Sequence, residues 1–307
     1  MTLATAPLSL PGQRPGPRVA SRTPDGWEDR LYTRFAVSAV APTIGAEISG
    51  VSLAEPIDPG LFAELNRALL EWKVLFFRDQ HLTHAQHSAM AASWGELEVH
   101  PFIRRRADQP ADQPDVVRLE KGPESPGFEN VWHSDVTWRE CPSLGSILQA
   151  IEIPPVGGDT LFADMGAAYD LLPDVVRAFI DTLTAVHDWI PTFGARMDPA
   201  ERDSLRPDFP AVEHPVVRTH PDTGRRTLYV NAAFTQHIVG MEAHESAELL
   251  RFLYRQAAIP EYQCRFRWTP GAVAFWDNRS TQHYASSDYH PQRRVMERLT
   301  IIGDRPA

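Results

Sequence analysis

Hydrophobic and polar positions follow two periods along this chain, one typical of short strands and one typical of amphipathic helices. Residues 35–53 alternate β-branched and small side chains between glycines, which indicates short strands joined by turns. From residue 61 to residue 72, leucines and a tryptophan recur at helical spacing, so we expect a helix that begins at Pro59 and Gly60. The apolar run 74–77 is short and continuous, as in a strand that is buried on both faces.

A capping box predicts a second helix. Thr83 lies three residues before Gln86, the spacing at which each side chain can bond to the backbone N–H of the other, and the helix is expected to reach about residue 94. His81, His84 and His87 follow one another at intervals of three in this stretch. Because residues at that spacing drift around a helix, a solvated face explains these histidines better than a metal site.

The remaining elements are mostly strands with helices inserted among them. Strands are expected at 116–119, 144–153, 160–162, 216–218, 228–231, 263–268, 272–276 and 295–302, and short helices at 167–172 and 174–183. A longer amphipathic helix over 242–258 is expected to bury Leu249, Leu250, Phe252 and Leu253. Residues 190–212 show no regular pattern. Because helices and strands do not alternate strictly, a doubly wound parallel sheet is disfavoured. The pattern favours a β-rich α+β protein with a double-stranded β-helix (jelly roll) core and flanking and inserted helices.

Two segments lie outside this pattern. Residues 1–32 are rich in proline, glycine and arginine without periodicity, so we interpret them as a disordered or loosely packed tail that precedes a single jelly-roll domain over 33–307. Residues 104–130 are polar and rich in proline and glycine. A loop of that length beside a suspected active site is typical of a lid, and a variable surface insertion is the alternative.

Composition limits the classes of partner. The chain has 307 residues, a formal net charge of -10 and a pI near 5.6, which argue against nucleic-acid and anionic-membrane binding. A small anionic substrate is still compatible with this charge, because arginines inside a pocket outweigh a distant surface. Cys141 and Cys264 are the two cysteines, too few for a disulfide framework or a zinc cluster. With no apolar run of membrane-spanning length and no signal-peptide core, we expect a cytoplasmic protein, and a homo-oligomer is compatible with the sequence.

The stretch Trp132-His133-Ser134-Asp135 carries the first candidate chemistry. In an extended strand His133 and Asp135 would point to the same side, and His283 could join them through the fold. Two imidazoles and one carboxylate on one face of a metal leave positions open and suit non-haem Fe(II), which must bind a co-substrate and oxygen. On its own the pair is a weak signal, because the chain contains 12 histidines.

Two arginines on the last predicted strand add a second signal. Arg294 and Arg298 lie four residues apart, so on a strand both point to one side, either into solvent or toward the interior. Buried arginines require anions, so an interior position implies two anionic ligands or one ligand with two anionic groups. Composition and spacing alone support only a β-rich protein with a candidate metal site. Three hypotheses are weighed for it: an oxygenase, a metal-dependent hydrolase, and a metal-free barrel that binds an anion. The hydrolase leaves Arg294 without a role.

Several motifs, in order and with matching spacing over about 38–306, resemble the taurine dioxygenase (TauD/TfdA) family of Fe(II)- and 2-oxoglutarate-dependent oxygenases. The matching motifs are Gly95-Glu96-Leu97-x-x-His100-Pro101, Trp132-His133-x-Asp135-Val136-Thr137, Gly157-Gly158-Asp159-Thr160-Leu161, Glu213-His214-Pro215, Leu228-Tyr229-Val230-Asn231, Trp276-Asp277-Asn278-Arg279, Thr281-Gln282-His283-Tyr284 and Pro291-Gln292-Arg293-Arg294-x-Met296-x-Arg298. The last motif is more similar to taurine dioxygenase than to the herbicide-cleaving branch of the family.

The resemblance implies a role for each matching residue. His133, Asp135 and His283 would bind iron, and Thr160 and Arg294 would hold the distal carboxylate of 2-oxoglutarate in a slot lined by Leu148 and Trp276. A substrate sulfonate would be bound by His100, Arg298 and the backbone at Val136, with its carbons against Phe193 and Phe234. The implied reaction consumes oxygen and 2-oxoglutarate, hydroxylates the carbon next to the sulfonate, and yields sulfite, an aldehyde, succinate and carbon dioxide.

Two positions depart from the taurine pattern around the substrate amine. Ile103 stands where these dioxygenases usually carry a tyrosine, and Glu129 stands where they place an asparagine. Glu129 could pair with an ammonium group, whereas Ile103 removes a polar contact. We therefore keep a longer or more apolar sulfonate beside taurine, and an alkyl sulfate ester or an aryloxy or other carboxylate as alternative substrates for the same chemistry.

Overall fold

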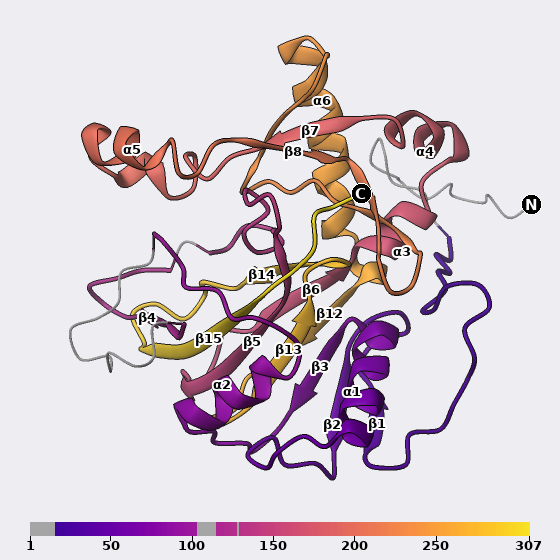
Figure 1. The fold of residues 1–307 in the computed structure, drawn as a ribbon, viewed down its shortest axis with the longest axis vertical. Helices are drawn as coiled ribbons and strands as arrows, with labels where there is room; N and C mark the ends of the chain where they lie inside the picture. Colours follow the sequence, from indigo (N-terminus) through magenta and orange to yellow (C-terminus); the bar gives the residue numbers. More distant parts are fainter. Residues whose placement is uncertain (1–15, 103–114, 128) are drawn as a thin grey trace, which may run out of the picture.

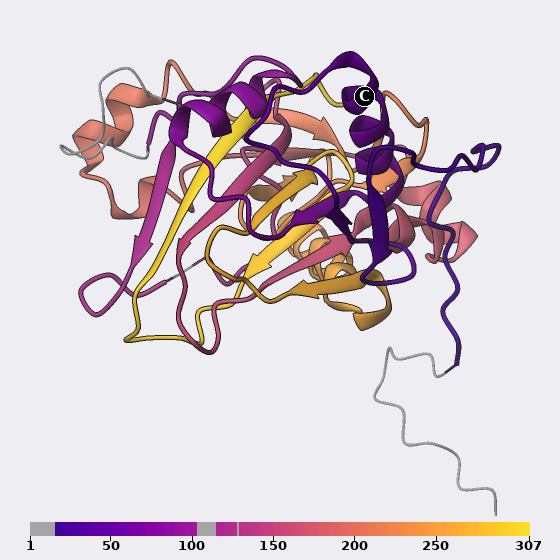
Figure 2. The ribbon, with the colours of Figure 1, turned by 90° about the horizontal axis from the view of Figure 1, so that it is seen from below.

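The computed structural model describes residues 16–102, 115–127 and 129–307, and its core is a sandwich of antiparallel strands (Figure 1). The larger sheet has the strand order β1-β2-β3-β13-β5-β15-β4, in which the β2–β3 pair alone is parallel. The smaller sheet has the order β12-β6-β14 and faces the larger one, as Figure 2 shows from a second direction. The strands of these two sheets are β1 Ala36–Ala39, β2 Ala46–Ser49, β3 Val74–Phe77, β4 Val117–Lys121, β5 Ser143–Glu152, β6 Thr160–Asp164, β12 Gln263–Phe266, β13 Val273–Asp277, β14 Thr281–Ala285 and β15 Arg294–Ile302.

Helices and two small sheets surround this sandwich. The strands outside it are β7 Thr184–His187, β8 Val212–Pro215, β9 Val217–Thr219, β10 Arg226–Leu228 and β11 Thr235–Ile238. The α-helices are α1 Pro59–Trp72, α2 His84–Ala92, α3 Met165–Asp170, α4 Asp174–Ile180, α5 Pro199–Leu205 and α6 Ala243–Tyr254, and short 3-10 helices lie at Gly194–Arg196, Arg255–Ala258 and Pro260–Tyr262. No helix within the described ranges is both long and apolar enough to cross a membrane.

The central strands of the larger sheet are buried on both faces, which explains the continuous apolar run of β3. Val74 and Phe76 belong to the apolar layer between the two sheets, whereas Leu75 and Phe77 pack with helix α1 on the opposite face. The alternation continues in β15, where Met296 faces the inner layer and Leu299 faces the outer one. Because side chains alternate along a strand, Arg294 and Arg298 share the inner face with Met296.

The local signals for α1 and α2 are present as expected. Helix α1 starts after Asp58, whose carboxylate accepts hydrogen bonds from the Gly60 and Leu61 amides at 2.8 and 3.0 Å. The capping box of Thr83 and Gln86 is formed at the start of α2. These caps satisfy amides that the first helical turn leaves without partners.

Four local expectations are wrong. Residues 199–205 form α5 inside the stretch that showed no pattern, and β10 ends at Leu228 rather than residue 231. On α6, Leu250 and Leu253 are buried but Phe252 is 41% exposed, because it lies on the opposite side of the helix. His87 is 1% exposed although a solvated face was expected, since α2 packs that side against the strands of the larger sheet.

The buried position of His87 predicts a pH effect on stability. Burial lowers the pKa of His87 from 6.5 to about 4, and unfolding restores the ordinary value. Below pH 6.5 the unfolded chain therefore binds more protons at His87 than the folded chain does. The stability linked to His87 is present above that pH and is lost as the pH falls toward 4. Between pH 7 and pH 5 we expect a loss of about 2 kcal/mol through this residue. His87→Leu should remove that part of the pH dependence, as measured by urea unfolding at both pH values.

His244→Leu is the matched control for this measurement. His244 is exposed on α6, so the variant should keep the pH dependence of the wild type. If His87→Leu and the wild type lose equal stability between the two pH values, the protonation of His87 is not coupled to folding.

The described part of the N-terminal segment contacts the end of α1. Arg22 pairs with Glu71 (Nη2–Oε1 2.8 Å) and lies 4.2 Å from the ring centroid of Trp72, and the Tyr32 hydroxyl donates to Glu71 at 2.6 Å. Arg67 lies 5.9 Å from the Trp27 ring. These contacts attach residues 16–32 to the body, and the domain boundary at residue 32 stays a prediction.

Candidate active site

His283 lies on β14, an edge strand of the smaller sheet, and His133 lies on the backbone segment that pairs with it. The amide of each donates to the carbonyl of the other, at 3.1 and 2.8 Å, and the two ring centroids lie 4.1 Å apart. The Ser134 hydroxyl, which donates to the Thr281 carbonyl at 2.6 Å, extends this attachment to the start of β14. Two histidines that are 150 positions apart in the sequence are thus held side by side by backbone pairing.

Asp135 lies in a turn, not in the strand expected for this stretch. The backbone leaves the bridge at His133 and turns over 135–138, and Val136 takes a left-handed conformation (φ 48°). This φ is unusual for a β-branched residue and indicates local strain that the surroundings must hold. The turn, rather than strand alternation, brings the carboxylate beside the imidazoles.

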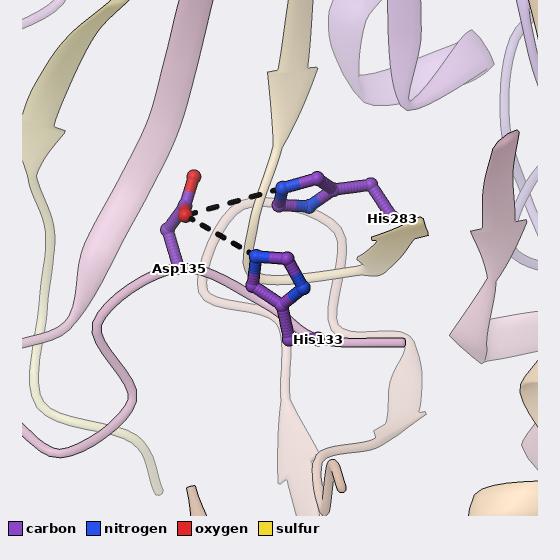
Figure 3. A group of neighbouring side chains, drawn as sticks. All are labelled: His133, Asp135 and His283. Atoms are coloured by element: carbon purple, nitrogen blue, oxygen red, sulfur yellow. Dashed lines mark ion pairs between the residues drawn. The ribbon is translucent and has the colours of Figure 1, made fainter. Parts of the chain in front are cut away.

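The three side chains converge as a metal site requires (Figure 3). Oδ1 of Asp135 lies 3.8 Å from Nε2 of His133 and 3.9 Å from Nε2 of His283, and the three candidate ligand atoms lie within 4.8 Å of one another. Nδ1 of His133 is 2.8 Å from the Val131 carbonyl, so it must carry the hydrogen, which leaves Nε2 available for a metal. Two imidazoles and one carboxylate on one side of an ion match the donor set of non-haem Fe(II) oxygenases.

Asn278 and Ser146 support the Asp135 carboxylate. The Asn278 side-chain oxygen accepts from the Asp135 amide (3.1 Å) and from the Trp276 indole (2.9 Å), while its nitrogen donates to Ser146 Oγ at 3.1 Å. Ser146 in turn donates to Oδ2 of Asp135 at 2.7 Å. Because the Trp276 ring lies 4.8 Å from the His283 ring, Asn278 is linked to two of the three candidate ligands.

Removing the Asn278 side chain is expected to weaken metal binding. Outer partners of metal ligands typically contribute about 10- to 100-fold in affinity, so Asn278→Ala should lower Co(II) or Fe(II) affinity by that factor. Anaerobic calorimetric titration measures this affinity directly. Asn130→Ala, an exposed asparagine three residues before His133, is the control and should bind metal like the wild type. Ser146→Ala serves as a second variant, and unchanged affinity in both variants would contradict a supporting role.

A cavity of about 400 Å³ opens beside this centre. It is lined by the metal-centre residues His133 and Asp135, by aromatic and apolar side chains, and by charged residues of β4 and β15; its walls include His100, Phe102, Arg118, Leu119, Glu120, Lys121, Glu129, Val131, Val136, Phe193, Ala233, Phe234 and Arg298. The volume lies within the range of small-molecule sites. The aromatic part of the wall is continuous, with Phe193 and Phe234 stacked at 6.0 Å and Phe234 6.3 Å from the His133 ring.

His100 offers a neutral N–H donor at the cavity wall. The Phe102 amide donates to Nδ1 of His100 at 3.2 Å, so Nδ1 is unprotonated and the ring hydrogen must be on Nε2. Burial lowers the pKa of His100 to about 3, which keeps the ring neutral near pH 7. A neutral imidazole of this tautomer can donate one hydrogen bond to an oxyanion.

Arg298 lies at the junction of the cavity and the metal centre. Its Nη1 donates to Oδ1 of Asp135 at 2.7 Å, and its Nε is buried without a hydrogen-bond partner among the described residues. Burial alone would raise the pKa of Asp135, but the charges of Arg298 and the two imidazoles hold that pKa well below its usual range. The Val136 amide, in the strained turn, also makes no hydrogen bond within the described structure.

Outside the cavity, Arg294 contacts the backbone two residues before Thr160. Nε of Arg294 donates to the Gly158 carbonyl at 3.2 Å, and Nη2 is buried without a partner in the described part of the chain. The backbone at Gly158 is left-handed (φ 72°), and a Cβ there would lie 3.1 Å from the Arg294 side chain, so both observations favour glycine. Thr160 accepts from the Trp268 indole at 3.0 Å, which leaves its hydroxyl hydrogen available.

The structure separates the two groups of predicted site residues. Leu148 and Trp276 belong to the apolar layer between the sheets, on the side of Thr160 and Arg294, and none of these four residues lines the 400 Å³ cavity. The residues assigned to a substrate do line it, except Ile103, which lies outside the described residues. The expected lid over 104–130 stays a prediction, because residues 104–114 and 128 lie outside the described residues; β4 occupies 117–121 within this stretch.

Glu129 has a partner that the sequence did not indicate. Its Oε1 lies 2.6 Å from Nζ of Lys121, on β4. Sequence reasoning also gave no role to Asn278 and Ser146, although Asn278 stands in one of the motifs. The signal for Asn278 was its position directly after Trp276-Asp277, whereas nothing local marks Lys121 or Ser146.

Comparisons with known proteins agree with this geometry. The profile described as "Taurine catabolism dioxygenase TauD, TfdA family" matches residues 36–300. An "Alkylsulfatase" of Acinetobacter baylyi is 37% identical over 269 residues, covering 85% of this chain and 83% of that protein. An "Alpha-ketoglutarate-dependent sulfate ester dioxygenase" of Pseudomonas putida is 37% identical over 278 residues, covering 88% and 90%.

Among solved structures, a taurine dioxygenase from Burkholderia xenovorans matches with a TM-score of 0.76 and 38% identity, covering 90% of this chain and 91% of that one. The match confirms the predicted jelly-roll core, here as two facing sheets without a closed barrel. The donor set at His133, Asp135 and His283 is the one that the iron chemistry of such enzymes requires. The chain therefore belongs to the TauD/TfdA family and is an Fe(II)- and 2-oxoglutarate-dependent dioxygenase.

Proposed function

We propose that this dioxygenase hydroxylates the carbon atom that bears a sulfonate group, in taurine or a related alkylsulfonate. Hydroxylation uses one oxygen molecule and one 2-oxoglutarate, which leaves as succinate and carbon dioxide. The hydroxylated carbon then loses the sulfur group with its bonding electrons, so the products are an aldehyde and sulfite. Fe(II), held by His133, Asp135 and His283, supplies the oxidising power together with 2-oxoglutarate and oxygen.

The side chains of the cavity bind and orient the substrate in this proposal. Arg298, Nε2–H of His100 and the Val136 amide hold the sulfonate, since charge-assisted hydrogen bonds to an oxyanion are strong and directional. Phe193 and Phe234 contact the carbon chain, and Glu129 closes the far wall. Fixing the anion beside the metal places one C–H bond at the reacting position, which is the main contribution of a protein to such a reaction.

The residues behind the metal centre bind the co-substrate. Arg294 pairs with the distal carboxylate of 2-oxoglutarate and Thr160 donates its hydroxyl hydrogen to it, while Leu148 and Trp276 form the apolar sides of the slot. The observation that supports this division most directly is the pair of buried arginines on one face of β15, of which Arg298 lines the cavity and Arg294 does not. Arg294 pairs with no carboxylate among the described residues, and Arg298, which pairs with Asp135, keeps a buried Nε without a partner there. Each arginine can therefore donate to a separate anion.

A sulfate ester is the second candidate substrate. The alkylsulfatase and sulfate ester dioxygenase relatives support it, and the same arginine and imidazole contacts suit a sulfate. Hydroxylation of the carbon next to the ester oxygen would release an aldehyde and sulfate instead of sulfite. The protein would catalyse the same hydroxylation with both substrates, and the released anion, sulfite or sulfate, distinguishes them.

Anaerobic titration followed by product analysis tests the proposal. Fe(II) and 2-oxoglutarate together should give a weak visible charge-transfer band that neither gives alone, and addition of a true substrate should shift the band. Oxygen is then admitted to samples with taurine, hexanesulfonate, hexyl sulfate or phenoxyacetate, and sulfite, sulfate and succinate are measured. Succinate formed in amounts equal to sulfite supports the sulfonate proposal, and succinate equal to sulfate from hexyl sulfate alone supports the second candidate. Coupling with phenoxyacetate alone would overturn both.

A further inference from the structure

We propose that the ion pair between Lys121 and Glu129 makes the enzyme favour sulfonates with an uncharged tail over zwitterionic aminosulfonates such as taurine. The inference rests on the proposed function, because it concerns the end of the substrate opposite to its sulfur oxyanion. The family pattern around the substrate amine suggested that Glu129 could receive an ammonium group. The structure gives that carboxylate a different cation.

The pair is built between two elements of the jelly roll. Lys121 is the residue of β4 that pairs with Arg294 on β15, so its side chain rises from the same inner face of the sheet. The Glu129 carbonyl accepts a hydrogen bond from the Ala285 amide, two residues beyond His283, at 3.4 Å. The Lys121 and Glu129 side chains are only 12% and 29% exposed, and both line the cavity. Figure 2 shows β4 beside β15 at the edge of the sheet.

The other carboxylates of the cavity wall are engaged as well. Asp135 pairs with Arg298, and Glu120 pairs with Arg293 at 2.9 Å and with Arg118 at 3.6 Å. An ammonium group that enters the described part of the cavity would therefore meet no carboxylate without a cation. To bind Glu129, the ammonium group would have to displace Lys121, which belongs to the same protein and therefore stays close to Glu129. The ammonium group would then lie beside the positive charge of Lys121.

The rest of the wall suits hydrocarbon. Phe102, Val131, Ala233 and the stacked rings of Phe193 and Phe234 form one apolar side of the cavity. An alkyl chain gains free energy by leaving water for this surface, whereas an ammonium group loses hydration there. The wall chemistry thus points to an amphipathic anion, with the sulfur group at the metal centre and an uncharged chain toward the Lys121–Glu129 pair.

The test compares taurine with hexanesulfonate in wild type and in Lys121→Met. The ratio of kcat/KM for the two substrates is measured by sulfite release, and their dissociation constants are measured by anaerobic calorimetry with Fe(II) and 2-oxoglutarate present. The wild type should prefer hexanesulfonate. Lys121→Met removes the lysine cation from Glu129 and should move both ratios toward taurine by about fivefold or more. The double variant Lys121→Met/Glu129→Gln should return toward the wild-type preference, and Lys121→Arg, which keeps the pair, should not change it.

A second variant keeps the test decisive if Lys121→Met does not fold. Glu129→Gln removes the Glu129 carboxylate beside Lys121, so the variant should favour 3-sulfopropanoate, whose tail is anionic, over hexanesulfonate by a similar factor. Unchanged ratios in folded Lys121→Met, or in folded Glu129→Gln, would overturn the role of the pair. If the wild type neither binds nor turns over hexanesulfonate, hexyl sulfate or taurine, the proposed function itself fails.

Discussion

Arg294→Ala is expected to weaken 2-oxoglutarate binding by about 100-fold or more while leaving metal binding intact. The Arg294 guanidinium is buried, its Nη2 has no partner within the described residues, and burial lowers its pKa because the charged form is desolvated. A carboxylate that reaches it completes two charge-assisted hydrogen bonds in a water-poor site. Removing one partner of such a buried pair costs about 2–5 kcal/mol, and every 1.4 kcal/mol is about tenfold in affinity.

The neighbouring arginine provides the control. Arg293 is 46% exposed in its side chain and pairs with Glu120 and Glu152 on the outer side of the strand. Arg293→Ala should therefore bind 2-oxoglutarate like the wild type. The dissociation constant is measured anaerobically by the visible band of the iron complex, and Co(II) affinity is measured in parallel. Normal 2-oxoglutarate affinity in Arg294→Ala would remove this residue from the co-substrate site and leave the buried guanidinium without an explanation.

Elements with a strong local period could be predicted from the sequence. The capping box at Thr83, the two-sided burial of β3 and the shared face of Arg294 and Arg298 all depend on spacing over a few residues. His87 shows the limit of such reasoning. Its spacing from His84 does not say which side of α2 meets the sheet, and that choice depends on how the whole helix packs.

The candidate site shows the same limit. The stretch around His133 and Asp135 was expected to be a strand, but the Asn278 side chain takes the Asp135 amide and the chain turns at Val136. The Lys121–Glu129 pair depends on the register of β4 against β15, which no local pattern contains. The family resemblance supplied the ligand set at His133, Asp135 and His283, whereas the supports of that set and the charge balance of the cavity required the fold.

His283→Ala is expected to lower Fe(II) or Co(II) affinity by more than about 100-fold, since loss of a ligand should exceed the 10- to 100-fold cost of losing an outer partner. Its Nε2 is one of three donor atoms that lie within 4.8 Å, and two remaining donors hold an ion poorly. The metal should also raise the melting temperature of the wild type, because a ligand that binds only the folded state stabilises it. That increase should disappear in the variant.

The His283 ring also packs against Trp276 and Phe162, with centroids 4.8 and 6.2 Å apart, so alanine leaves a space in the apolar layer. His283→Gln preserves most of that volume and separates packing from ligation: it should fold like the wild type and still lose metal affinity. His244→Ala, on the exposed side of α6, should bind metal normally. If folded His283→Gln and His283→Ala both bind Co(II) as tightly as the wild type, the metal does not use this imidazole. The backbone bridge between His133 and His283 would then serve only the fold.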